Sequence, residues 1–390
     1  MDKGTILYIG NFGMPTSNAA GKRVYGNARL LESLGYKVLL IGKDKQSERG
    51  WEYQFDTISY VSFPNLGMRK TKAYVEWAEK YLSEKRVVPK LVIRYGSPSL
   101  ALFEYDLYKW TKKRGIPLVV DVVDWLSADG GSVLFNIVKT VDTTLAKACF
   151  NKKGSGLIAI STYLSDYYCS YGEKRIILPP LVERYHEPMP CGSEIHIGYA
   201  GSPFRKNTRI KDVAKVKDRL DLAVVALCKV TTKNLNVFFH IYGMNVDEYL
   251  CAFPEHKELV ENSKNILFHG MVPMDTVQES ISKMDFTILL RDKNRATMAG
   301  FPTKVVESLA CCTPVITTDT SDLKRYIKNG ENGFIVDITS TDKLVEDLEH
   351  IVSLSKDERQ NLKKKCRNSK DFLYTEYEVP MKVFLAKIGL

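Results

Sequence analysis

The feature that most constrains the fold of this 390-residue chain is a regular alternation of short apolar runs with longer helical stretches. Near-continuous apolar runs are typical of parallel strands in a sheet that helices cover on both faces. One series of runs lies at 6–9, 38–41, 91–93, 118–123, 157–160 and 176–178, and a second at 195–200, 237–241, 266–268, 286–290, 314–316 and 333–336. The pattern predicts an α/β protein with doubly wound sheets.

A proline-dense stretch separates the two series and predicts a linker between two domains. It contains Pro179, Pro180, Pro188 and Pro190. We therefore predict an N-terminal Rossmann-like domain over 1–185 and a C-terminal one over 186–370. A last helix over about 371–390 is expected to pack back on the first domain.

Composition and charge limit the class of protein. No apolar run is long enough to span a membrane, the first residues do not resemble a secretory leader, and the eight cysteines are scattered without a CxxC pair. We therefore expect a cytoplasmic chain without a metal site. Residues 1–190 hold 27 Lys and Arg against 19 Asp and Glu. This excess of positive charge can bind nucleic acid, an anionic membrane surface or an anionic substrate, or can simply keep the protein soluble. No nucleic-acid-binding motif accompanies the charge.

The strongest motif lies in the second half, over residues 299–316, and is followed by glycines at 330 and 333. Pro302, Thr303 and Lys304 open a helix directly after the strand at 286–290. The free N–H groups and positive dipole end of such a helix favour a diphosphate. One turn further, Glu307 can accept two hydrogen bonds from a ribose, or can simply complement the helix dipole.

This segment resembles the family-4 retaining glycosyltransferases of GT-B fold, of the bacterial surface-polysaccharide type. The resemblance implies two Rossmann-like domains that face each other across a cleft, with the acceptor on the N-terminal domain and the nucleotide-sugar on the C-terminal one. The family carries two glutamates eight positions apart, the second on the ribose and the first near the donor sugar. Glu307 matches the second, whereas the first position is Ala299; the nearest replacements are Arg291 and Asp292.

A second stretch that resembles the family is the strand at 195–200 with the glycine turn behind it. In the family a basic pair after this glycine binds the donor diphosphate without a metal ion, which gives Gly201 a donor-binding role and Arg205 and Lys206 a catalytic one. Fixed cations can stabilise the leaving diphosphate in place of a metal. Arg209 and Lys211 are the alternative pair.

The loop after the first strand resembles the loop of the family in which acceptor and donor sugar meet. Gly13 is then expected near the donor, and Gly21, Lys22 and Arg23 near an anionic acceptor or the donor phosphates. The loop does not fit the GxGxxG spacing of nicotinamide-binding proteins.

The strand at 118–123 leads to an acid and an aromatic residue where the family often places a histidine. Asp124 is a candidate catalytic residue that would hydrogen-bond a sugar or acceptor hydroxyl; alternatively, it caps the next helix. Trp125 is the candidate to stack on a pyranose of the acceptor.

The function implied by the resemblance is that of a metal-independent retaining hexosyltransferase without a cofactor. It would move a sugar from a UDP- or GDP-sugar to a glycan or lipid-linked acceptor in surface polysaccharide synthesis, in the cytoplasm or on the inner face of the membrane. A nucleotide-sugar epimerase of the same fold and a catalytically inactive nucleotide-sugar-binding partner are the alternatives.

Overall fold

The computed structural model describes residues 3–13, 18–43, 52–55, 58–66, 70–96, 101–125, 133–204 and 206–390. The chain divides into two compact units. Unit 1 comprises Met1–Glu183, Met298–Phe301 and Phe372–Leu390, and unit 2 comprises Arg184–Thr297 and Pro302–Asp371. The division lies close to the predicted boundary at 185/186.

Unit 1 is built on a mostly parallel sheet in the order β3-β4-β2-β1-β5-β6-β7-β8, and only the edge strand β3 runs antiparallel to its neighbour. The strands are β1 Thr5–Gly10, β2 Lys37–Gly42, β3 Glu52–Phe55, β4 Ile58–Ser62, β5 Pro89–Gly96, β6 Leu118–Val122, β7 Gly156–Ala159 and β8 Arg175–Ile177. Strands β1 and β5 neighbour each other although five elements separate them in sequence. The strand order therefore reverses between them.

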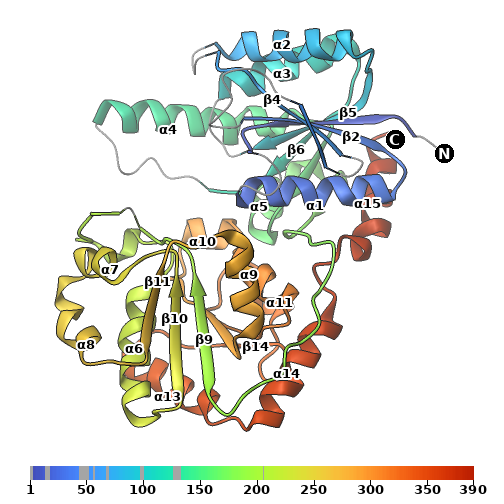
Figure 1. Cartoon of the computed structure of the whole chain (residues 1–390). Helices are drawn as coiled ribbons and strands as arrows, with labels where there is room; N and C mark the ends of the chain where they lie inside the picture. The colour runs from blue at the N-terminus through green and yellow to red at the C-terminus, as the bar shows by residue number, and fades with distance from the viewer. Residues whose placement is uncertain are drawn as a thin grey trace. The chain divides into compact units, whose positions relative to one another are not determined.

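Helices cover both faces of the unit 1 sheet (Figure 1). They are α1 Ala19–Ser33, α2 Thr71–Glu84, α3 Ala101–Arg114, α4 Val133–Ala148, α5 Thr162–Tyr167 and α15 Glu378–Lys387. Helices α2 and α3 bury Tyr74, Leu82 and Leu107 against Leu7 and Ile41 of the sheet. Helices α1, α5 and α15 lie on the other face.

Unit 2 is a parallel sheet in the order β11-β10-β9-β12-β13-β14. Its strands are β9 Ile195–Ala200, β10 Val237–Tyr242, β11 Ile266–Gly270, β12 Phe286–Leu289, β13 Val315–Thr317 and β14 Gly333–Ile335. Its helices are α6 Leu220–Lys233, α7 Val246–Ala252, α8 Lys257–Glu261, α9 Met274–Lys283, α11 Thr303–Ala310, α12 Leu323–Tyr326, α13 Thr341–Val352 and α14 Lys356–Ser369. Helix α10, Arg295–Ala299, begins in unit 2 and ends in unit 1. The strand order reverses between β9 and β12.

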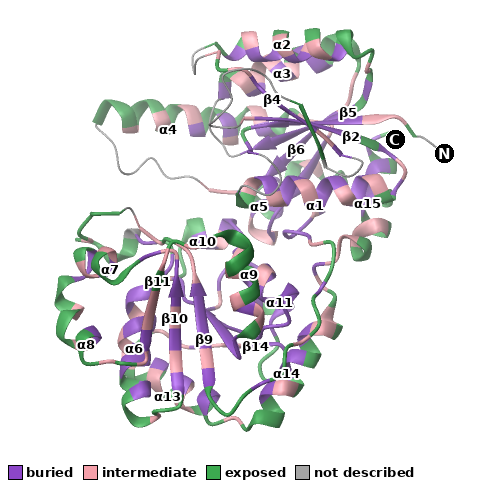
Figure 2. Cartoon of the chain, viewed as in Figure 1, coloured by how far each residue is buried: buried purple, intermediate pink, exposed green. Residues whose placement is uncertain are grey.

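The predicted fold class is confirmed, because each expected apolar run forms a strand of one of the two sheets. Most of these strands are largely buried (Figure 2), whereas β8, β11 and β14 have one buried residue each. Two strands of unit 1, β3 and β4, were not predicted. Glu52, Tyr53 and Gln54 of the edge strand β3 are exposed, so no apolar run marks this strand.

In the part of the chain that the structure describes, no helix combines the length and the apolar content needed to cross a bilayer.

Candidate functional site

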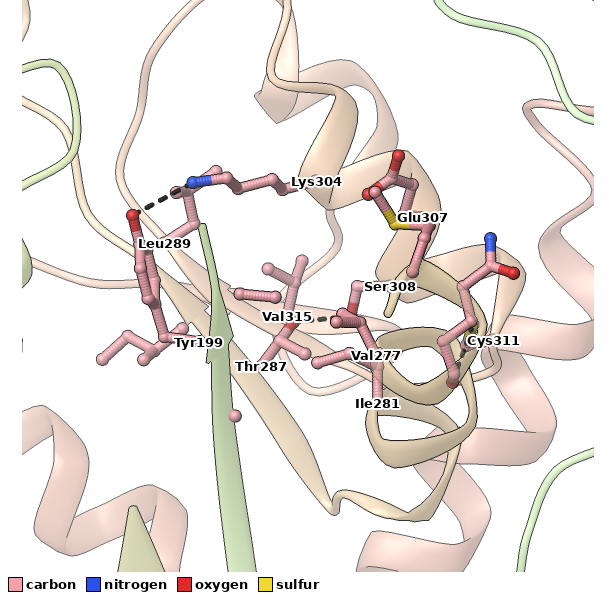
Figure 3. A pocket seen from close by; sticks show the side chains of 15 residues that line it. Tyr199, Val277, Ile281, Thr287, Leu289, Lys304, Glu307, Ser308, Cys311 and Val315 are labelled. Carbon is pink, nitrogen blue, oxygen red and sulfur yellow. Dashed lines mark hydrogen bonds between the residues drawn. The ribbon is translucent and has the colours of Figure 1, made fainter. Parts of the chain in front are cut away.

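In unit 2 the strand order reverses between the neighbouring strands β9 and β12. Ligands of doubly wound sheets bind outside the carboxyl ends of the strands at such a point. A pocket there is lined by Gly198 and Tyr199 of β9, Thr287 and Leu289 of β12, and Lys304 and Glu307 of α11 (Figure 3), with α9 closing one side. Helix α11 is anchored to β12, because the hydroxyls of Thr287 and Ser308 are 2.5 Å apart.

A buried carboxylate, Asp218, organises the charges at this end of the sheet. Its Oδ2 accepts a hydrogen bond from Lys304 Nζ at 2.5 Å, and its Oδ1 accepts one from Arg291 Nε at 2.8 Å. Tyr199 donates its hydroxyl to the same carboxylate at 3.0 Å and accepts from Lys304 Nζ at 3.0 Å. Two cations and one carboxylate leave this cluster with a net positive charge.

The two basic partners of Asp218 keep its carboxyl group ionised. Burial by itself raises the pKa of a carboxyl group, but Lys304 and Arg291 outweigh it and hold the pKa of Asp218 below its ordinary value. Burial, with Asp218 nearby, raises the pKa of Tyr199 well above its ordinary value, so Tyr199 stays protonated and donates. Burial lowers the pKa of Lys304, and the negative charge of Asp218 opposes that shift.

The space beside Lys304 depends on Gly201, the residue after β9. Gly201 has φ +152°, and a Cβ atom on it would lie 2.1 Å from Lys304 Nζ. Gly243, after β10, has φ +103° and packs so closely that a Cβ atom on it would lie 2.7 Å from the carbonyl oxygen of Gly201. Both glycines keep the carboxyl ends of the strands open next to the ammonium group of Lys304.

Helix α11 brings a carboxylate to the same pocket. It begins at Thr303, and Pro302 before it supplies no side-chain acceptor for the first N–H groups. Glu307 follows Lys304 by three positions, which places both side chains on one face of the helix. In Figure 3, Lys304 reaches toward Tyr199, and Glu307 lies one turn further along the helix. The pocket thus joins an ammonium group and a half-buried carboxylate, both from α11.

Comparison with known proteins gives a fold and a family model that matches part of unit 2. Residues 212–369, which include Asp218 and α11, match the family model for glycosyl transferases group 1. A search of curated protein sequences finds no match.

Solved structures resemble the chain over nearly its whole length. Sucrose-phosphate synthase from Thermosynechococcus elongatus has a TM-score of 0.71 at 12% identity and covers 99% of both chains. The Anabaena protein HepE in complex with UDP and glucose has a TM-score of 0.66 at 14% identity, over 98% of this chain and 99% of that one. WaaG, a glycosyltransferase involved in lipopolysaccharide biosynthesis, has a TM-score of 0.62 at 15% identity, over 99% of this chain and 100% of that one. The fold is GT-B.

In unit 2 the predicted donor-binding residues fall into two groups. Gly201, Pro302, Thr303, Lys304 and Glu307 lie at the carboxyl ends of the strands or on α11. Arg291 is only 6% exposed and its guanidinium holds Asp218, so it positions the cluster and does not present a free surface to a donor. Asp292, the other predicted replacement for the missing glutamate, is held by Arg219 at 2.8 Å.

The basic pair predicted after Gly201 is described only in part. Arg205 lies outside the described residues. Lys206 is exposed and forms an ion pair with Glu248 at 2.6 Å. The alternatives Arg209 and Lys211 are exposed. The catalytic role of this pair stays a prediction.

The position of the missing glutamate is filled by an apolar residue. Ala299 is fully buried, and Ser161 donates its hydroxyl to the Ala299 carbonyl at 2.6 Å; both residues belong to unit 1. No side-chain carboxylate is therefore available at position 299.

Arg23 differs most from its prediction among the residues of unit 1. It is 1% exposed: Nη2 lies 2.7 Å from Asp121, and Nη1 donates to the carbonyl of Leu178 at 2.9 Å. Tyr8 donates to the same carboxylate at 2.5 Å. Arg23 is therefore part of the buried core of unit 1 and leaves no guanidinium surface for an acceptor.

The other predicted residues of unit 1 follow β1 or begin α1. Gly13 is buried in the loop after β1, and the backbone N–H of Gly21 caps α1 through a 2.8 Å bond to Asn18. Lys22 is half-buried. Their contacts to donor or acceptor stay predictions.

Asp124 and Trp125 follow β6 and are half-buried. The ring of Trp125 lies edge-on to Tyr167, with centroids 4.8 Å apart, and Lys147 Nζ is 4.4 Å from the Trp125 centroid. The aromatic ring is thus held in place by α4 and α5. Its stacking on a sugar stays a prediction.

Sequence reasoning missed Asp218 and Tyr199, the two residues that hold Lys304. Tyr199 lies inside a strand that was recognised, but its hydroxyl was given no role. Asp218 lies in a charged stretch without a motif. In the sequence, the only signal for Asp218 is its place just before the apolar helix α6. In the structure, the backbone N–H of Arg219 donates to the carbonyl oxygen of Leu290, directly after β12. Among the described residues, no group of three or more His, Cys, Asp or Glu is placed to hold a metal ion.

Proposed function

We propose that this chain is a retaining glycosyltransferase that moves a sugar from a nucleoside diphosphate donor, UDP- or GDP-linked, to a hydroxyl of a glycan or lipid-linked acceptor. The observation that carries the proposal is the cluster of Lys304, Asp218 and Tyr199 next to Glu307 at the strand-order reversal of unit 2. A positive cluster beside the N-terminus of α11 suits a diphosphate. The structure of HepE with UDP and glucose, which shares the fold, is consistent with such a donor.

In the proposed reaction the acceptor oxygen bonds to the anomeric carbon on the face that the diphosphate leaves. The bond from that carbon to the phosphate oxygen breaks, and the acceptor proton passes to the departing phosphate oxygen. This front-face route requires no carboxylate nucleophile, which agrees with alanine at position 299. Lys304, with Arg205 and Lys206 as the proposed catalytic pair, would stabilise the negative charge that grows on the leaving group.

The experiment that tests this function is a panel of UDP- and GDP-sugars with the full chain and a mixture of oligosaccharide and lipid-linked acceptors. We expect acceptor-dependent release of a free nucleoside diphosphate from one donor. Tight donor binding without release or transfer would favour the inactive nucleotide-sugar-binding partner, and a changed sugar on an intact donor would favour an epimerase.

Glu307→Gln is expected to weaken binding of the nucleotide by about 1.5 to 3 kcal/mol, because a neutral amide accepts less strongly from ribose hydroxyls than a carboxylate. Calorimetric titration with UDP and GDP measures the change. The matched control is Glu346→Gln on α13, an exposed glutamate that does not line the pocket. Equal affinities of wild type and Glu307→Gln would remove Glu307 from the ribose site.

Treatment with EDTA is expected to leave the rate of transfer within about twofold of the untreated rate, since fixed cations take the place of a metal in stabilising the leaving diphosphate. The rate is measured after chelation and again after manganese is added back. Loss of activity that manganese restores would refute the metal-independent mechanism.

We also propose that the chain works at the inner face of a membrane. A lipid-linked acceptor is reached at that surface, and exposed bases such as Lys70, Lys85, Arg86, Lys112 and Lys113 of unit 1 provide attraction to anionic lipid. Arg69, the basic residue next to Lys70 in the sequence, lies outside the described residues. Such attraction is screened by salt.

A further inference from the structure

Helix α4 of unit 1 exposes an apolar face. Seven of its large apolar side chains are exposed, from 41% at Leu145 to 78% at Val133. The other five are Leu134, Phe135, Ile137, Val138 and Val141. At 3.6 residues per turn, all of these positions except 135 fall within one arc of roughly 140°. No charged residue of α4 lies within that arc.

The opposite side of α4 is the side that packs on the protein, and it is polar. Thr143 and Ala146 are the buried residues of the helix. Asp142 accepts a hydrogen bond from the backbone N–H of Ala101 at 2.8 Å, and Lys147 lies over the ring of Trp125. A surface helix of a globular protein normally turns its apolar face inward. Helix α4 does the reverse, as its largely exposed ribbon shows (Figure 2).

The charges around α4 indicate what covers this face. Helix α3 and the turn Phe150–Lys152 pack against α4 and its C-terminal end. Exposed lysines lie on α3, at Lys109, and at the end of this turn, at Lys152 and Lys153. Two copies that met through α4 would bring these lysines together. An anionic bilayer would instead neutralise them while its acyl region accepts the apolar arc.

We propose that α4 lies in the plane of an anionic membrane surface, with its apolar arc inserted at the boundary between headgroups and acyl chains. This deepens the proposed membrane association, because it adds an inserted helix to the general attraction of a basic unit. It rests on the exposure and charge of α4 and is measured without donor or acceptor. A failure of the glycosyltransferase proposal is therefore distinguishable from a failure of this one.

The test is co-sedimentation of the full chain with vesicles of equal parts phosphatidylcholine and phosphatidylglycerol, at low and high salt. The α4 variant carries Leu134→Ser, Val138→Ser and Val141→Ser. The matched control carries Val88→Ser, Leu235→Ser and Val379→Ser, three apolar residues outside α4 that are equally exposed or more so. We expect wild type and control to bind alike, and the α4 variant to bind at least about tenfold more weakly at both salt concentrations, because it loses apolar burial in the bilayer.

Two results would overturn the proposal. The first is vesicle binding of the α4 variant equal to that of the control, or no binding of wild type at low salt. The second is a wild-type dimer in sedimentation analysis that the α4 variant loses, which would assign the apolar face to a second copy. Circular dichroism and thermal unfolding check that the α4 variant keeps the wild-type fold, as expected for substitutions at exposed positions.

Discussion

Replacing Asp218 by asparagine is expected to lower the free energy of unfolding by about 3 kcal/mol. The carboxylate forms ion pairs with Lys304 and Arg291 at 2.5 and 2.8 Å, and Arg291 is buried. Removing one partner leaves buried charge uncompensated, which costs several kcal/mol. Lys304 is 29% exposed, so solvent relieves part of its share. Urea unfolding followed by circular dichroism measures the loss of stability.

The control for this variant is Asp342→Asn, which breaks an exposed ion pair between Asp342 and Lys229. Exposed pairs contribute about 0 to 1 kcal/mol, so the control should remain close to wild type. The pH dependence follows from the lowered pKa of Asp218. A carboxylate whose pKa is lowered on folding stabilises above its unfolded pKa, near 4, and loses that contribution below it. The difference between wild type and Asp218→Asn should thus be constant from pH 6 to 8 and shrink below about pH 4; a difference that disappears at neutral pH would contradict the account.

Replacing Arg23 by methionine is expected to destabilise the protein by about 3 to 5 kcal/mol, since it leaves Asp121 buried without its cation. Both side chains are at most 1% exposed. Leu178 also loses the donor to its carbonyl oxygen. Thermal and urea unfolding measure the effect.

Lys22→Met, one residue earlier, separates a structural from a binding role. Lys22 is half-buried, so its replacement should change stability little and affect acceptor binding if the prediction for Lys22 is right. A stable Arg23→Met protein with impaired acceptor use would restore the acceptor-binding role that the burial of Arg23 argues against.

The sheets were predictable from sequence because parallel strands covered on both faces need continuous apolar runs. Burial of all but the first residue of β1 and of β2 illustrates this requirement. The residues of the site were harder to predict when their role depended on burial. Lys22 and Arg23 look alike as a basic pair, but Arg23 shares the inward face of α1 with Val24, Asn27, Leu30 and Leu31.

Partners far apart in sequence could not be predicted at all. Asp218 and Lys304 are 86 positions apart, and the sequence around each residue gives no sign that the other is its partner. The motif around Glu307 was recognisable because its spacing is local to one strand, loop and helix. Helix α4 shows a further limit: its apolar periodicity is that of a core helix, and only the structure shows that this face is exposed.

The central claim is that unit 2 holds a nucleoside diphosphate at the reversal point between β9 and β12. Its most direct test is calorimetric titration of wild type and Lys304→Met with UDP, GDP and the corresponding nucleosides. The account predicts that one nucleoside diphosphate binds wild type and that Lys304→Met weakens this binding about tenfold or more through loss of a charge-assisted bond to phosphate. Binding of the nucleoside alone should not change. Equal binding of the diphosphate by both proteins, or no binding by wild type, would contradict the account.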